Sequence, residues 1–121
     1  MKIRFFDGDF AVCKVPDAGG VNLMSDLYFL SQTPDELSLV CHERDVPANA
    51  SKTDAGWKMF RIEGQLDFGL VGILAGISGA LAARGISIFA VSTYDTDYVL
   101  IKADKAAEAR AALAEAGHEV V

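Results

Sequence analysis

A short polar segment, Ser92-Thr-Tyr-Asp-Thr-Asp97, separates two apolar stretches in the second half of the chain. Its hydroxyl and carboxylate oxygens are hydrogen-bond acceptors that suit an ammonium group. Asp97 opens a strand-like stretch, where aspartate is disfavoured, so it is the stronger candidate for a ligand contact. Asp95 fits ordinary turn chemistry equally well, and the hydroxyls of Ser92 and Thr93 can simply cap a hairpin.

A second candidate for ligand contact is the glycine-containing segment Gly69-Leu-Val-Gly72, which precedes a helical pattern of apolar residues. The N–H groups at the start of a helix, together with its dipole, favour a carboxylate. Alternatively, these glycines allow close packing of the helix on a sheet, as Gly76 and Gly79 would further along. The sequence leaves both interpretations open.

Catalytic and metal sites are not indicated. Two carboxylates can serve acid–base catalysis, but no nucleophile or partner base accompanies them. His42 and His118 are far apart in the sequence, and a metal site would need a further ligand. Cys13 and Cys41 lack CxxC spacing and stand in apolar runs, which predicts small buried hydrophobes. We therefore expect a binding protein that is not an enzyme and has no cofactor.

The second half of the chain contains the elements that would position these residues. Asp67 can cap the first helix, Gly85 can end it, and Tyr94 and Tyr98 are interpreted as partly buried aromatics of a hairpin. The order βαββαβ is that of a ferredoxin-like fold, an α+β fold with an antiparallel sheet. The predicted elements are a strand at 57–62, a helix at 70–83, strands at 86–91 and 97–102, a helix at 105–116 and a strand at 118–121.

The first half resembles a degenerate copy of the second. When Ser31 is placed over Ser92, Glu36 falls on Asp97 and apolar residues fill the strand that follows. Strands are predicted at 10–15, 28–32 and 37–42, with a short helical turn at 21–26 and a polar linker at 43–56. We therefore expect a degenerate βαββ unit over 1–56 and a complete βαββαβ unit over 57–121. Three phenylalanines near the amino terminus either enter a core or line a dimer contact; they are Phe5, Phe6 and Phe10.

Composition limits the partners of the chain. It has 121 residues, of which 51% are hydrophobic, and a net charge of −6 with no basic run. This balance argues against binding to nucleic acid or to an anionic membrane. No apolar stretch reaches the ~18 residues of a transmembrane helix, and the amino terminus does not read as a signal peptide. A cytoplasmic location is expected.

Three motifs resemble the ACT domain family, and most of all its branch of CASTOR arginine sensors and small standalone bacterial proteins. They are Gly64-Gln-Leu-Asp-Phe68, Val71-Gly-Ile-Leu74 and the run from Gly85 to Leu100, all downstream of Trp57. The upstream run Thr33–Cys41 resembles the amino-terminal part of the bacterial proteins. The resemblance covers nearly the whole chain.

This resemblance implies a regulatory module, usually dimeric, that binds an amino acid or a similar small zwitterion at an interface between ACT units. Backbone amides at the start of the first helix would hold the ligand's carboxylate; these belong to Leu70, Val71, Gly72 and Ile73. The strand–turn residues would hold its amino group; these are Ser92, Thr93, Tyr94, Asp95 and Asp97. Asp67 and Phe68 would shape the loop.

Two functions remain open at this level. A standalone module of this kind can sense a small molecule and act on a regulated partner protein. Alternatively, it is a ligand-free interaction or dimerisation module with the same fold.

Overall fold

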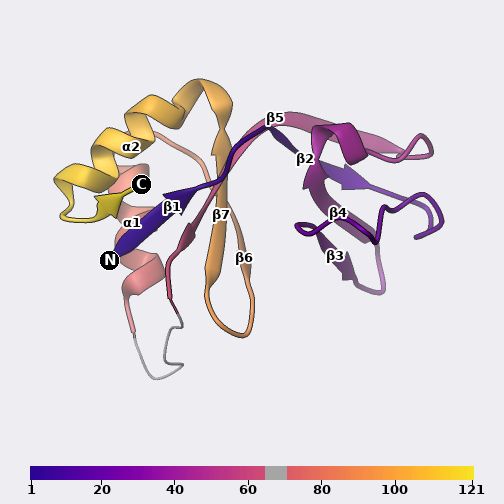
Figure 1. The fold of residues 1–121 in the computed structure, drawn as a ribbon, viewed down its shortest axis with the longest axis horizontal. Helices are drawn as coiled ribbons and strands as arrows, with labels where there is room; N and C mark the ends of the chain where they lie inside the picture. Colours follow the sequence, from indigo (N-terminus) through magenta and orange to yellow (C-terminus); the bar gives the residue numbers. More distant parts are fainter. Residues whose placement is uncertain (65–70) are drawn as a thin grey trace. The chain divides into compact units, whose positions relative to one another are not determined.

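The computed structural model describes residues 1–64 and 71–121. The described elements, shown in Figure 1, are β1 (Lys2–Phe5), β2 (Phe10–Lys14), β3 (Phe29–Gln32), β4 (Leu37–His42), η1 (Glu43–Asp45), β5 (Lys52–Ile62), α1 (Ile73–Ala82), β6 (Phe89–Ser92), β7 (Asp97–Lys102), η2 (Ala103–Lys105), α2 (Ala106–Glu115) and β8 (Glu119–Val120). The chain divides into two compact units. Unit 1 combines Met1–Asp7 with Lys58–Val121, and unit 2 is Gly8–Trp57.

Unit 1 has an α+β architecture, as predicted. Its strands follow the order β8-β1-β5-β7-β6, with residues 58–62 of β5 in this unit. Strand β1 pairs antiparallel with β5, Ile3 opposite Ile62, and parallel with β8, Ile3 opposite Val120. The expected ferredoxin-like order of elements is present, but β1 lies between β5 and β8. The sheet is therefore mixed rather than purely antiparallel.

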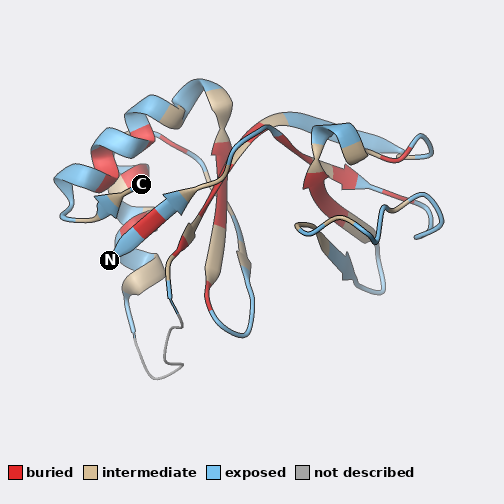
Figure 2. Cartoon of the chain, viewed as in Figure 1, coloured by how far each residue is buried: buried red, intermediate tan, exposed pale blue. Residues whose placement is uncertain are grey.

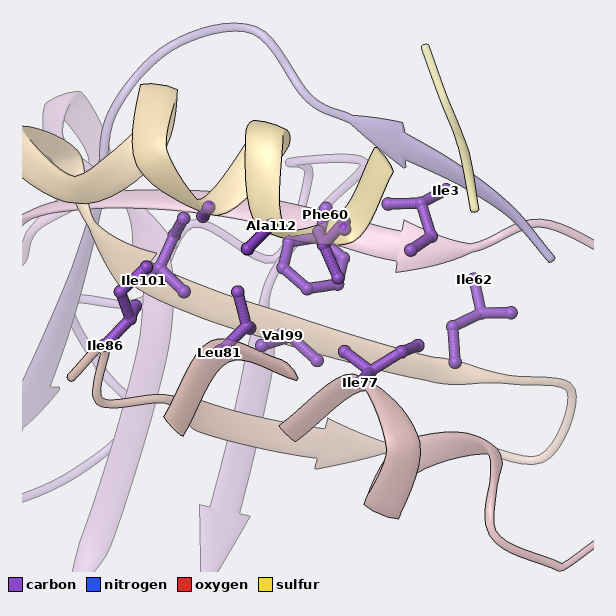
Figure 3. Packing of buried hydrophobic residues seen from close by; sticks show 11 residues of the cluster. Ile3, Phe60, Ile62, Ile77, Leu81, Ile86, Val99, Ile101 and Ala112 are labelled. Atoms are coloured by element: carbon purple, nitrogen blue, oxygen red, sulfur yellow. The ribbon is translucent and has the colours of Figure 1, made fainter. Parts of the chain in front are cut away.

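The core of unit 1 lies between its sheet and its two helices. Figure 3 shows Ile3 and Phe60 on the strands facing Ile77 and Leu81 of α1, and all four are fully buried. Apolar residues on alternate strand positions and on one face of each helix account for this layering. The Phe5 ring packs on Phe60 with centroids 5.1 Å apart. Phe5 therefore enters a core.

Unit 2 is built on a four-stranded antiparallel sheet in the order β3-β4-β2-β5, to which β5 contributes residues 52–57. Its core cluster includes Cys13, Leu39 and Cys41. All residues of unit 2 are described, and they form no α-helix. The short helical turn predicted at 21–26 is a hydrogen-bonded turn and not a helix: the N–H of Ser25 donates to the carbonyl of Asn22 at 3.3 Å, and the Asn22 side chain accepts the N–H of Met24 at 3.1 Å.

Each unit contains a β-hairpin of the same register, and the two hairpins are 60 residues apart in the sequence. Strand β3 pairs with β4 as Phe29 opposite Val40, and β6 pairs with β7 as Phe89 opposite Leu100. A 3-10 helix follows β4 and β7 alike. The predicted internal repeat is therefore present in this hairpin, but the predicted alignment of the two copies is wrong by one residue. Asp97 corresponds to Leu37 rather than to the acidic Glu36.

The remaining element predictions differ from the structure mainly at their ends. Strands β4 and β7 have the predicted bounds, whereas α1 begins at Ile73 rather than at residue 70. Strand β5 begins at Lys52, inside the segment predicted as a linker, and β1 was not predicted. Each α-helix has ten residues, and no helix in the described ranges has the length and apolarity needed to cross a bilayer.

Candidate functional site

The β6–β7 hairpin brings together two of the predicted site residues. Ser92 ends β6, Asp97 begins β7, and the two are directly opposite in the ladder. The Ser92 hydroxyl donates a hydrogen bond of 2.6 Å to Oδ1 of Asp97. This bond orients the carboxylate of Asp97, a half-buried residue, and leaves its second oxygen and further lone pairs as acceptors for a cation.

The turn between these strands carries the next predicted residues. The N–H and hydroxyl of Thr93 both donate to the carbonyl of Thr96, at 2.9 and 3.0 Å. Tyr94 is 75% exposed, and Asp95 is exposed as well. Tyr94 is therefore not the partly buried aromatic that its sequence suggested, whereas Tyr98 is half-buried. Figure 2 shows this turn as a largely exposed segment.

The start of α1 supplies a second group of candidates. Gly72 is its N-cap residue in the left-handed conformation, with φ of +82°, and no side chain caps the helix within the described ranges. The first N–H groups of a helix have no partner inside it. Val71 is 91% exposed, whereas the Ile73 side chain packs against the core. The backbone N–H of Ile73 is therefore the group that it offers to a ligand's carboxylate.

Three predicted residues lie outside the described residues, namely Asp67, Phe68 and Leu70. The N-cap residue of α1 is Gly72. Figure 1 shows that the β6–β7 turn and the start of α1 lie at the same end of unit 1. The predicted carboxylate and ammonium contacts thus belong to one end of one unit.

Replacement of Gly72 by alanine is expected to destabilise the protein by about 1–2 kcal/mol, because a Cβ is unfavourable at positive φ. The cause is conformational, since a Cβ there would meet no described atom within 4 Å. The matched control is Gly76→Ala inside α1, which also has open space but ordinary φ. It should stabilise by about 0.5–1 kcal/mol. Urea denaturation measures both changes, and equal effects of the two would contradict this account.

The outer face of α1 consists of small residues. Gly76 and Gly79 are exposed, and a Cβ on either would meet no described atom within 4 Å. The expectation that they allow close packing on the sheet is therefore wrong. A shallow groove of about 620 Å³ runs along this face, and none of the predicted site residues lines it. Its lining residues are Ala75, Ser78, Gly79, Ala82, Gly85, Ile86, Ser87 and Ile88.

The cysteines and histidines do not form a further site in the described ranges. Cys13 and Cys41 are free and buried, as predicted. Burial, together with the neighbouring Cys13, raises the pKa of Cys41 to about 12, which keeps this thiol protonated and unreactive. Burial also lowers the pKa of His118. No group of three or more His, Cys, Asp or Glu side chains in the described ranges could hold a metal ion.

Sequence reasoning did not single out Thr96. It is the one buried polar or charged side chain among the residues that the structure describes, and its hydroxyl donates to the carbonyl of Ile62 at 2.7 Å. Its position between two aspartates suggested an exposed turn residue. Only the packing of the hairpin against β5 shows that Thr96 is buried and bonded to that strand.

Comparisons with known proteins add the following findings. An ACT domain model matches residues 52–115. The cytosolic arginine sensor for mTORC1 subunit 1 of Homo sapiens is 47% identical over 49 residues, which are 40% of this chain and 15% of that protein. The chain thus spans less than a sixth of the length of this curated relative.

Two solved structures are also similar. Protein Atu0741 from Agrobacterium tumefaciens is 28% identical, with a TM-score of 0.86 over 99% of this chain and 91% of that one. The regulatory subunit of aspartate kinase from Thermus thermophilus is 15% identical, with a TM-score of 0.60 over 90% of this chain and 91% of that one. The second likeness concerns the fold alone. Because the ACT domain model covers more than half of the residues, including the hairpin and the described start of α1, the chain belongs to the ACT domain family.

Proposed function

We propose that this chain is a regulatory protein that binds an amino acid reversibly at an interface between ACT units. The ligand's carboxylate lies at the N–H groups of the start of α1, and its ammonium group lies at the β6–β7 hairpin. Asp97 is the principal acceptor, and Ser92 holds its carboxylate in place. The remaining residues proposed to line the site are Asp67, Phe68, Leu70, Val71, Gly72, Ile73, Thr93, Tyr94 and Asp95.

The observation that carries this proposal is the hydrogen-bonded pair of Ser92 and Asp97. The carboxylate of Asp97, a half-buried residue at a strand end, is oriented by one neighbouring hydroxyl and can accept charge-assisted hydrogen bonds. The corresponding positions of unit 2 hold Gln32 and Leu37, which offer no such carboxylate. We therefore propose one ligand per chain, bound at unit 1, and no catalytic role.

L-Arginine is the first ligand to test. The curated relative that shares 47% identity over 49 residues is named as a cytosolic arginine sensor. An acidic residue at the site suits a ligand that carries one or two cationic groups. The same relative supports a cytoplasmic location for this chain.

A second copy of the chain is the proposed partner at this interface. Strand β6 forms one edge of the sheet in unit 1, and an uncovered edge favours pairing with another chain. The neighbouring small-residue face of α1 permits close approach of a helix. A ligand that bridges two units then shifts the population toward the docked arrangement, by no more than the difference between its affinities for the docked and undocked states. A regulated partner protein would bind one of these arrangements in preference to the other.

A thermal-shift screen against the twenty amino acids tests the proposal. A ligand present at a hundred times its Kd stabilises the native state by about 2.7 kcal/mol, which for a chain of this size raises Tm by roughly 10 °C. Agmatine, which lacks the carboxylate of arginine, and D-arginine serve as matched controls. Both should raise Tm less than L-arginine does, and calorimetry should give one ligand per chain.

The alternative is a ligand-free interaction or dimerisation module. The exposed groove and small-residue face of α1 favour it, because they can contact another protein without any small molecule. No shift of Tm with any amino acid, combined with a stable dimer in sedimentation equilibrium, would establish this alternative and overturn the proposed sensor.

A further inference from the structure

The β6–β7 hairpin is tied to the rest of unit 1 by a buried side chain. The Thr96 hydroxyl donates to the carbonyl of Ile62, 34 residues away, at 2.7 Å, and Thr96 is only 7% exposed. Within the turn, the Thr96 carbonyl accepts both the N–H and the hydroxyl of Thr93. Thr96 thus adds a buried side-chain link to β5 at the turn end of the hairpin, besides the pairing of β7 with β5, and the next residue along the chain is Asp97.

Ile62 also belongs to the core on which helix α1 packs. It is the last residue of β5, and its fully buried side chain belongs to the core cluster that includes Ile77. Figure 3 shows both side chains in the layer between sheet and helix. Ile77 lies in the first half of α1, just over one turn beyond Gly72. The hydrogen bond from Thr96 to Ile62, and the core cluster to which Ile62 and Ile77 both belong, therefore connect the two groups of predicted ligand contacts.

The repeated hairpin in unit 2 shows that this tie is not required for the turn itself. The position 60 residues before Thr96 is Glu36, which is exposed. Its carbonyl accepts the N–H of Thr33 at 2.9 Å, the same backbone bond that Thr93 and Thr96 make. In the described ranges, however, the Glu36 side chain makes no hydrogen bond to another strand. A buried hydroxyl at this position thus belongs to unit 1, which has the Ser92–Asp97 pair.

We propose that Thr96 is a positioning residue for ligand binding, which holds Asp97 at a fixed distance from the start of α1. This inference rests on the proposed amino-acid site. The amino and carboxylate groups of an amino acid share one carbon atom, so the two groups of protein contacts must keep a set separation. Small displacements of such contacts weaken binding strongly.

The test compares Thr96→Val, which keeps the shape but removes the hydroxyl, with Thr96→Ser, which keeps the hydroxyl. Glu36→Val is the matched control in the repeated hairpin. Amide hydrogen exchange without ligand should quicken about tenfold at residues 92–98 in Thr96→Val, as expected for loss of a buried hydrogen bond. Exchange at residues 31–38 should not change. If Thr96→Val does not fold, Thr96→Ala replaces it, because the smaller side chain admits water to the Ile62 carbonyl.

Binding is then measured by calorimetry with L-arginine, or with the amino acid that gives the largest shift of Tm, at a temperature where every variant is folded. Thr96→Val should raise Kd about tenfold or more, whereas Thr96→Ser and Glu36→Val should bind nearly as the wild type does. Unchanged Kd in Thr96→Val, or equal loss in Thr96→Ser, overturns the inference. A wild type that binds no amino acid overturns the proposed function instead, and the exchange comparison still decides whether Thr96 holds the hairpin.

Discussion

Replacing Asp97 by alanine should raise the Kd for the amino-acid ligand by roughly 10- to 150-fold while the protein stays folded. The lost interaction is a hydrogen bond between two charged groups, which contributes about 1.5–3 kcal/mol. Stability should fall by less than about 1 kcal/mol, because Asp97 is only half-buried and water can replace its bond to the exposed Ser92. Calorimetry measures Kd, and urea denaturation measures stability.

Two further variants make this experiment specific. Asp35→Ala removes an exposed carboxylate from the corresponding turn of the repeated hairpin in unit 2, and we expect it to change Kd by less than about threefold, since this turn lies outside the proposed site and exposed charges contribute little. Asp97→Asn keeps the shape and one acceptor oxygen but loses the charge, so it should bind more weakly than the wild type. Wild-type affinity in Asp97→Ala would show that the ligand lies elsewhere.

Truncation of Phe60 to alanine should destabilise unit 1 more than any surface change. Phe60 is fully buried in the core between sheet and helices (Figure 3), and its ring packs on Phe5. Loss of a buried phenylalanine and the cavity that remains cost about 3–5 kcal/mol, a large part of the 5–15 kcal/mol typical of a domain. Urea denaturation followed by circular dichroism gives the change in the free energy of unfolding.

Leu23→Ala is the control for this prediction. Leu23 is 60% exposed in unit 2, so its truncation should change stability by no more than about 0.5 kcal/mol. Trp57 also lies in unit 2 and is buried, and its fluorescence should therefore report on that unit. If Phe60→Ala shifts the fluorescence and dichroism transitions unequally, the two units unfold separately. A loss below 1 kcal/mol would contradict the packing described for this core.

Local patterns predicted those elements whose bounds depend on nearby residues. Strands β4 and β7 have the predicted bounds because each is a mainly apolar segment that directly follows a polar turn. The start of α1 was missed by three residues. Leu70 and Val71 fit the helical spacing of apolar residues, but the left-handed backbone of Gly72 delays the helix to Ile73. Apolar spacing alone does not reveal such a reversal of φ.

Strand β1 could not be predicted in the same way. Its partners are residues around Ile62 and Val120, far along the chain, so no neighbouring turn or strand in the sequence marks it. The same limit explains the one-residue error in the repeat. Sequence similarity aligned Ser31 with Ser92, whereas the strand pairing in the two hairpins aligns Gln32 with Ser92. Register is decided by which side chains face the core.

The sequence by itself determined the family, the α+β class, the β6–β7 hairpin and the identity of its polar residues. These follow from local spacing and from motifs that need no knowledge of distant contacts. Only the tertiary structure decided that Ser92 bonds to Asp97, that β1 enters the sheet of unit 1 and that Thr96 is buried against Ile62. Each of these depends on strand pairing or packing between residues apart in the chain, and the free energy of burial, rather than local preference, selects among the possible pairings.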